Sequence, residues 1–179
     1  LGFNHIKNIV IALSMMEAVR GLVDSRFDQK KYWLHSIMTA ITAKKIADDL
    51  GYSTSGEAFT AGLLHDLGIP VIYKYFNKEF NLIIESVKNE EHSFEEAEKL
   101  FLGVTHGDIG KFLIDRWNLP MDLSEVVKSH HCPAESDNES NLVSLVHLAD
   151  YMVDLLLEEN FQWDSNYYFD ESVIDTLRL

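Results

Sequence analysis

The stretch that decides the fold is Glu57-Ala58-Phe59-Thr60-Ala61-Gly62-Leu63-Leu64-His65-Asp66-Leu67-Gly68. Its apolar residues recur with the spacing of a helix and not with the alternation of a strand. Two polar residues, His65 and Asp66, interrupt the apolar pattern just before Gly68. Adjacent side chains on a helix point in different directions, so both can reach one centre only where the helix ends. We therefore expect a helix that ends here, with Gly68 marking the place where its geometry loosens.

The helical period continues on both sides of this stretch, and strand alternation nowhere persists over more than a few residues. Only three prolines and nine glycines interrupt the 179 residues. Cap signals at Asp28, Ser93 and Thr105 and stop signals at Gly51 and Pro120 divide the pattern into helices. The expected helices cover 4–23, 29–50, 55–68, a short segment from 70, 79–88, 94 onward, 106–117, 121–131, 142–158 and 170–177. The sequence thus predicts one all-α domain over residues 1–179, without repeats or linkers.

The charge composition excludes several classes of partner. Lys and Arg number 15 and Asp and Glu 29, which gives a net charge of −14. Such a surface repels nucleic acid and anionic lipid, and no apolar run reaches the roughly 18 residues of a membrane helix. We expect no nucleic acid and no membrane as partner, while a small anionic ligand stays open if metal ions invert the charge locally. Cys132 is the single cysteine, and the N-terminal residues do not have the pattern of a secretory signal peptide, so we expect a cytoplasmic protein.

A set of histidines and aspartates lies where apolar helices would turn it inward. An ionised Asp in such surroundings is costly unless it is paired or bound to a metal. Neutral imidazoles together with carboxylates are natural ligands for Fe, Mn, Zn, Ni or Co. Taken singly, the members have ordinary interpretations: an isolated His is more often a hydrogen-bonded core residue, Asp66 could cap the next helix, and Asp150 could pair with a Lys or Arg. The metal hypothesis depends on the order and spacing of the whole set, which is His35, His65, Asp66, His106, His130, His131 and Asp150.

The order His, His-Asp, His, His-His, Asp resembles the HD superfamily of metal-dependent phosphohydrolases. The flanking residues are closer still to its HDOD family, the HD-related output domains of bacterial signalling proteins. The resemblance covers about residues 1–155 and implies an all-α HD-superfamily helical bundle. Since members usually have a helical segment before the point where this chain begins, at Leu1, it also implies a fragment that lacks this segment. It is carried by Leu1-Gly2, Asn8-Ile9-Val10, Tyr32-Trp33-Leu34-His35-Ser36, the stretch 57–68, Trp117-Asn118-Leu119-Pro120, His130-His131-Cys132-Pro133 and Val146-His147-Leu148-Ala149-Asp150.

The resemblance also implies a role for each polar residue. One divalent metal ion would be held by His35, His65, Asp66 and Asp150. Asp66 would bridge to a second ion, held also by His106, His130 and His131. Fe or Mn is the expected metal, with Mg, Ni, Zn or Co as alternatives, and Asp66 and His65 are the expected catalytic residues. Many HDOD members lack some of these ligands and act as regulatory modules, whereas this chain resembles the HD-GYP cyclic-di-GMP phosphodiesterases in having all seven.

The sequence departs from the HD-GYP enzymes at two places. Where they carry a Lys shortly after the HD motif, this chain has Ile69 followed by Pro70. Their GYP signature is also missing, because the residues after His131 read Cys132-Pro133-Ala134. Specificity for cyclic-di-GMP therefore does not carry over, and the missing phosphate-binding cation predicts slow phosphoester cleavage.

Two functions remain open from the sequence, beside a polar cluster filled only with water. One is a phosphohydrolase acting on a small phosphorylated ligand, in which His65 or His147 could move a proton, although a core role is the simpler interpretation of His147. The other is a catalytically silent signalling module that binds a partner protein or a nucleotide, with metal bracing its helices. The complete ligand set favours the first function and the missing Lys favours the second. The nearest basic candidates for binding phosphate are Lys74, Lys111 and Lys128, and each is more simply a surface lysine.

Overall fold

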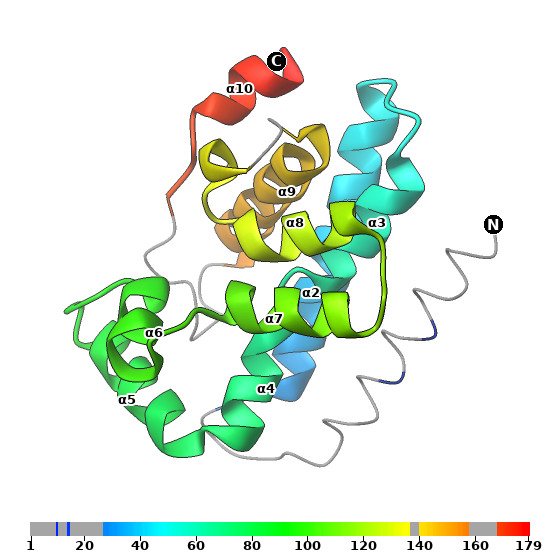
Figure 1. The fold of residues 1–179 in the computed structure, drawn as a ribbon. Coiled ribbons are helices and arrows are strands. Elements are labelled where there is room, and N and C mark those ends of the chain that lie inside the picture. The colour runs from blue at the N-terminus through cyan, green and yellow to red at the C-terminus, as the bar shows by residue number, and fades with distance from the viewer. Residues whose placement is uncertain (1–9, 11–13, 15–26, 137–139, 158–167) are drawn as a thin grey trace.

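The computed structural model describes residues 27–136, 140–157 and 168–179, together with Val10 and Ser14. Every regular element in this part of the chain is a helix, which confirms the all-α prediction (Figure 1). The helix expected over 4–23 lies outside the described residues apart from Val10 and Ser14. The α-helices are α2 (Gln29–Asp49), α3 (Ser55–Leu64), α4 (Gly68–Tyr75), α5 (Asn77–Lys88), α6 (Phe94–Leu102), α7 (His106–Arg116), α8 (Met121–Ser129), α9 (Asn141–Leu157) and α10 (Ser172–Leu177), with a 3-10 helix η1 (Pro133–Glu135) after α8. None of the described helices is both long and apolar enough to cross a bilayer.

Side-chain caps begin three helices where the sequence predicted them. The Asp28 carboxylate accepts the backbone N–H of Lys30 at 2.9 Å, and α2 starts beside it. Ser93 and Thr105 each form a capping box, which opens α6 and α7. Because Thr105 fixes the first turn of α7, it also fixes the direction in which His106 leaves the backbone.

The structure has the expected break between two helices at this stretch, with both helix boundaries a few residues earlier than expected. α3 ends at Leu64, and α4 begins at Gly68. The turn between them holds His65, Asp66 and Leu67. This turn allows His65 and Asp66, which are neighbours in sequence, to face the same centre.

Two apolar cores lie on either side of this turn. The larger is built by α2, α3, α8 and α9 and includes Leu67, whereas the smaller is built by α4, α5 and α6 and includes Ile69. Burying each such side chain stabilises the fold by about 1.5–3 kcal/mol. The chain thus crosses from one core to the other directly after Asp66. α5 and α6 lie side by side at one edge of the molecule, away from α3 and α10 (Figure 1).

The position at which HD-GYP enzymes carry their Lys belongs to the smaller core. The Ile69 side chain is 0% exposed and packs in the same cluster as Tyr32 and Phe80. A lysine ammonium there would have to lose its water without gaining a partner. Restoring the missing cation by Ile69→Lys would therefore disturb the core rather than supply a phosphate ligand.

Candidate metal centre

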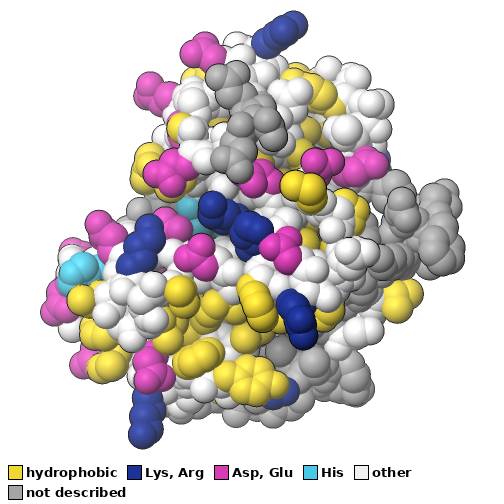
Figure 2. Space-filling view, viewed as in Figure 1, with side chains coloured by type: hydrophobic (Ala, Val, Ile, Leu, Met, Phe, Trp, Pro, Cys, Tyr) yellow, Lys and Arg dark blue, Asp and Glu magenta, His cyan; other side chains and the backbone are white. Residues whose placement is uncertain are grey.

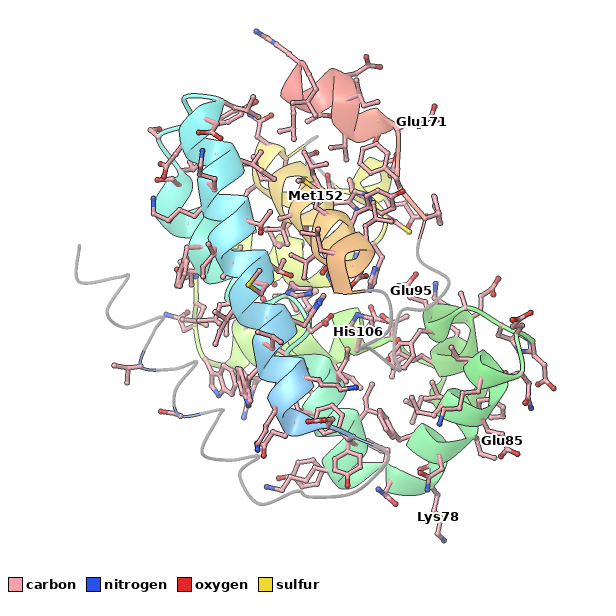
Figure 3. All side chains as sticks on the ribbon, turned by 180° about the vertical axis from the view of Figure 1, so that it is seen from behind. Lys78, Glu85, Glu95, His106, Met152 and Glu171 are labelled. Atoms are coloured by element: carbon pink, nitrogen blue, oxygen red, sulfur yellow. The ribbon has the colours of Figure 1, made fainter. Side chains whose placement is uncertain are left out.

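Five separate segments bring the seven predicted side chains to one place. His35 comes from α2, His65 and Asp66 from the turn after α3, and Asp150 from α9. His106 is the first residue of α7, and the pair His130-His131 directly follows α8. All seven are buried, and the most exposed of them, His131, is only 6% exposed. In Figure 3 the His106 side chain lies in the interior, between α2 and the pair α5–α6.

Three of the side chains, with one oxygen of Asp66, form the first half of the centre. His35 Nε2 lies 2.9 Å from Asp150 Oδ1 and 3.1 Å from His65 Nε2. His65 Nε2 lies 3.2 Å from the same Asp150 oxygen and 3.2 Å from Asp66 Oδ2. We call this set, His35, His65 and Asp150, the first half-site.

The other three side chains face the second oxygen of Asp66. Asp66 Oδ1 lies 3.4 Å from His130 Nε2 and 3.6 Å from His106 Nε2. His131 Nε2 lies 3.1 Å from His106 Nε2. We call this set, His106, His130 and His131, the second half-site. Asp66 thus stands between the half-sites with one carboxylate oxygen toward each.

The hydrogen bonds of the Nδ1 atoms in His65 and His130 determine whether the Nε2 atoms can bind a metal ion. His65 Nδ1 lies 2.7 Å from the Gly62 carbonyl, and His130 Nδ1 lies 3.1 Å from the Val127 carbonyl. A carbonyl only accepts, so Nδ1 carries the hydrogen and donates it. In the neutral ring the Nε2 atom then has a free lone pair. Both lone pairs face the carboxylates, an arrangement that suits a cation.

The buried carboxylate oxygens also indicate a site for a cation. While the His65 and His130 rings are neutral and carry their hydrogens on Nδ1, both oxygens of Asp66 and the Oδ2 atom of Asp150 are buried without a hydrogen-bond donor among the described residues. Leaving such atoms unsatisfied is expensive. The cluster of imidazole nitrogens and carboxylate oxygens can hold metal ions in two groups, Asp66 with the second half-site and the first half-site by itself, within each of which the ligand atoms lie within 4.8 Å of one another. The residues present therefore fit divalent metal ions.

The pKa values follow from the same arrangement. Burial disfavours a charged imidazole, but the carboxylates of Asp66 and Asp150 outweigh burial and raise the pKa of His65 well above its ordinary value. Burial also opposes ionisation of Asp66 and Asp150, yet the charge of His65 outweighs it and holds the pKa of both carboxyls well below the usual range. Burial lowers the pKa of His130 and His131. In the metal-free protein the centre thus keeps its carboxylates ionised and a proton on His65.

Metal affinity is expected to fall as the pH falls. Because the pKa of His65 is raised, a metal ion must displace a proton from this ring, and binding weakens by about tenfold per pH unit below that pKa. Calorimetric titrations with Mn²⁺ from about pH 8 to about pH 6, in two buffers with different ionisation enthalpies, would count the released protons. An affinity independent of pH over this range would show that His65 holds no metal.

Several residues that the sequence did not single out surround the centre. Glu98 on α6 is 0% exposed, and its Oε2 atom lies 2.9 Å from His106 Nδ1. Asp154 on α9 approaches His35 Nδ1 at 3.4 Å. The Tyr32 hydroxyl donates to the Asp66 carbonyl at 3.3 Å, and burial raises the pKa of this hydroxyl so that it keeps its proton. Helical spacing could have indicated Glu98, because it lies four residues after the buried Phe94 on the apolar face of α6.

The contacts of the other candidate residues fit the simpler interpretations given above and not a role in proton transfer or phosphate binding. His147 Nδ1 donates to the His130 carbonyl at 2.7 Å, and its Nε2 accepts the Asp170 N–H at 2.9 Å. Both nitrogens are thus engaged in positioning backbone, which fits the core role. Lys111 pairs with Asp115 at 2.6 Å, Lys74 lies over the Tyr75 ring at 5.5 Å, and Lys128 is exposed. Figure 2 shows basic side chains interspersed with acidic ones on the face over α7 and α8, so this face carries no continuous basic surface.

Known proteins with this fold were found by sequence and by structure. The family model for the HDOD domain matches residues 1–133. An uncharacterised protein of Treponema pallidum is 23% identical over 159 residues, which are 87% of this chain and 30% of the relative. An HDOD domain protein of unknown function from Geobacter sulfurreducens has a TM-score of 0.79 at 25% identity and covers 99% of this chain and 58% of its own.

Two further structures are similar. A Marinobacter aquaeolei protein, provisionally described as a signal transduction protein, has a TM-score of 0.78 at 25% identity, over 100% of this chain and 40% of its own. A Shewanella amazonensis protein, provisionally described as a phosphohydrolase, has a TM-score of 0.74 at 23% identity, over 99% of this chain and 69% of its own. The chain thus spans less than two thirds of the Treponema, Geobacter and Marinobacter proteins. Since the family model matches well over half of its residues, and the fold agrees over nearly its whole length, this chain belongs to the HDOD domain family.

Proposed function

We propose that this chain is the output domain of a bacterial signalling protein, and that its buried centre binds two divalent metal ions and hydrolyses a phosphoester. The observation that carries the proposal is the position of Asp66, with one carboxylate oxygen toward each half-site. A carboxylate in this position can bridge two ions, which is the geometry of many phosphohydrolases. The likeness to the Marinobacter protein supports the signalling part of the proposal.

The donor sets give each ion its own ligands. The first ion would be held by His35, His65, Asp150 and Asp66, a set of two imidazoles and two carboxylates. The second would be held by Asp66 and the three histidines of the second half-site. Such mixed imidazole and carboxylate sites suit Fe or Mn best, with Mg, Ni, Zn or Co as alternatives.

The protein's own residues prepare this centre for hydrolysis. Bound ions would supply a nucleophilic water and stabilise the charge of the phosphate in an in-line displacement. Asp66 sets the separation of the two ligand groups, and the Gly62 and Val127 carbonyls hold the His65 and His130 rings in the required tautomer. The almost complete burial of the ligands keeps the local dielectric low, which strengthens each electrostatic contact.

Hydrolysis is expected to be slow and metal-dependent. Protein loaded anaerobically with Mn²⁺ or Fe²⁺ should cleave p-nitrophenyl phosphate or its bis ester, at about a hundredth of the rate of an enzyme with a phosphate-binding Lys, because Ile69 supplies no cation. The assay compares mono- and diesters, nucleotides and cyclic dinucleotides against Asp66→Ala as the blank. No turnover above that blank with any metal would rule out the phosphohydrolase.

A catalytically silent regulatory module is the second candidate. Two observations favour it: Ile69 is buried in the smaller core, and no ligand other than His131 is more than 1% exposed. A substrate could then reach the ions only after a movement of the surrounding helices. In this function the ions brace the helices, and the ligand is a signalling protein or a nucleotide. Metal that raises the melting temperature without any turnover would support it.

A further inference from the structure

Glu98 is a buried carboxylate that the hydrolytic proposal does not use. It lies on α6, is 0% exposed, and its Oε2 atom accepts two hydrogen bonds from the same residue. One comes from the His106 backbone N–H at 3.0 Å and the other from His106 Nδ1 at 2.9 Å. Among the described residues, these are the donors that reach Glu98, and no Lys or Arg there forms an ion pair with it. A carboxylate buried in this way is costly, so its interaction with His106 must compensate for the cost.

One of the two hydrogen bonds holds the backbone of His106, and the other holds its ring. The backbone N–H of the first residue of a helix has no partner inside the helix, and Glu98 satisfies it for α7. The second bond requires a hydrogen on Nδ1, so the lone pair of the neutral ring is on Nε2. That atom lies 3.4 Å from His130 Nε2 and 3.1 Å from His131 Nε2. Glu98 thus aims His106 at the second half-site.

The first half-site has a carboxylate in the equivalent place. Asp154, one helical turn after Asp150 on α9, lies with Oδ1 3.4 Å from His35 Nδ1, a close approach without the hydrogen bond that Glu98 makes. His65 and His130 instead have backbone carbonyls behind them. Each half-site therefore contains one histidine that faces an acidic side chain on its outer side. A hydrogen-bonded acceptor such as Glu98 orients a ligating histidine, and Asp154 places a carboxylate close to His35 on the same outer side.

From this arrangement, and resting on the proposed two-ion centre, we infer that Glu98 is a positioning residue for the second ion alone, and that Asp154 serves the first. Glu98 also links α6 to the centre. α6 packs chiefly on α5, at the edge of the molecule (Figure 1). The Glu98 carboxylate carries a hydrogen bond from this helix pair to a ligand histidine. The second ion should therefore depend on α6, and the first should not.

The test measures each half-site separately. Asp150→Asn weakens the first half-site and leaves the second ion to be titrated, while His131→Ala does the reverse. Glu98→Gln is then introduced into both backgrounds, and Mn²⁺ binding is measured anaerobically by calorimetry. We expect affinity to fall about 10–100-fold in the Asp150→Asn background and to stay within about threefold in the His131→Ala background. Asp154→Asn should give the opposite pattern.

A matched control separates positioning from general effects of charge. Glu85→Gln removes the same charge from an exposed position on α5, the helix that packs on α6, and it should change neither affinity. Thermal unfolding of the metal-free proteins checks that Glu98→Gln folds normally. Equal losses in both backgrounds, or none in either, would overturn the role of Glu98 while leaving the two-ion centre standing. If the wild-type protein binds no Mn²⁺ or Fe²⁺, the proposed function is overturned, and this inference with it.

Discussion

Asp66→Ala is expected to release both metal ions and to abolish any hydrolysis together with them. The reason is that Asp66 faces both half-sites, with Oδ2 3.2 Å from His65 Nε2 and Oδ1 3.4 Å from His130 Nε2. Removing the carboxylate that the half-sites share would take one ligand from each ion and leave several imidazoles close together. Metal analysis of protein purified without chelator measures the loss directly.

The loss of stability in Asp66→Ala can be compared with that of a surface variant. When the free metal concentration is a hundred times the dissociation constant, each bound ion adds about 2.7 kcal/mol to the free energy of unfolding, and losing the ion removes that amount. Over a chain of this size, that lowers the melting temperature by about 5–10 °C per ion. Asp122→Ala removes the same charge from an exposed position at the start of α8 and should leave metal content and melting temperature unchanged. Unchanged metal content in Asp66→Ala would mean that Asp66 is not the bridging ligand.

The result also separates the two candidate functions. If the centre is only structural, Asp66→Ala should lower the melting temperature while binding of a partner protein stays largely intact. If the centre hydrolyses a phosphoester, turnover should disappear even at temperatures where the variant remains folded. The comparison therefore requires an assay well below the melting temperature of the variant.

Most of the helical fold could be predicted from the sequence because its signals are local. The caps at Asp28, Ser93 and Thr105 act on N–H groups two or three residues away, and the apolar period is visible within a single helix. The helix boundaries expected near residues 68 and 70 were a few residues late, because no local signal marks the buried turn at 65–67. Leu67 and Ile69 hold that turn from two different cores, and such contacts are not visible in the local sequence.

The candidate ligands could be named from the sequence because their order is distinctive, whereas the residues around them could not. Glu98 stands in the acidic segment 90–98, where its neighbours are solvated or cap the helix. Asp154 resembles any acidic residue near the end of a helix. What distinguishes both is contact with a histidine from another helix. Predictions that the structure leaves untested include the single domain over 1–179, the partner, the cytoplasmic location, and the metal-binding and catalytic roles of the candidate residues.

The interpretation of Gly68 from the sequence missed its main role. Gly68 follows the turn, but its backbone is not in the left-handed region, so the loosened geometry does not require a glycine there. The close approach of α7 does require one. A Cβ atom on Gly68 would lie 2.0 Å from the His106 carbonyl oxygen and 2.7 Å from its carbonyl carbon. The turn that holds Asp66 and the helix that begins with His106 thus meet backbone to backbone.

Gly68→Ala is therefore expected to destabilise the protein by about 3 kcal/mol or more. Ordinary contacts of a Cβ atom are longer than 3.4 Å, and the atom it would meet belongs to the backbone, so α4 and α7 must move apart. That movement would separate Asp66 Oδ1 from His106 Nε2, which lie 3.6 Å apart. We expect the melting temperature to fall by about 6–12 °C and the affinity for the second ion to fall with it. Thermal unfolding and Mn²⁺ titration below the unfolding transition measure the two effects.

Gly51→Ala is the matched substitution elsewhere in the chain. Gly51 has a φ of +77° and nothing within 4 Å of an added Cβ, so alanine there is strained only by its backbone conformation. Gly51→Ala should lower the free energy of unfolding by about 1–2 kcal/mol. It should leave metal binding intact, since Gly51 follows the end of α2 that is distant from the metal centre. A Gly68→Ala protein that is as stable as Gly51→Ala and binds both ions normally would show that α4 and α7 can move apart freely. The distance between the half-sites would then not be set by this contact, and the bridging position of Asp66 would have to be maintained by the two cores alone.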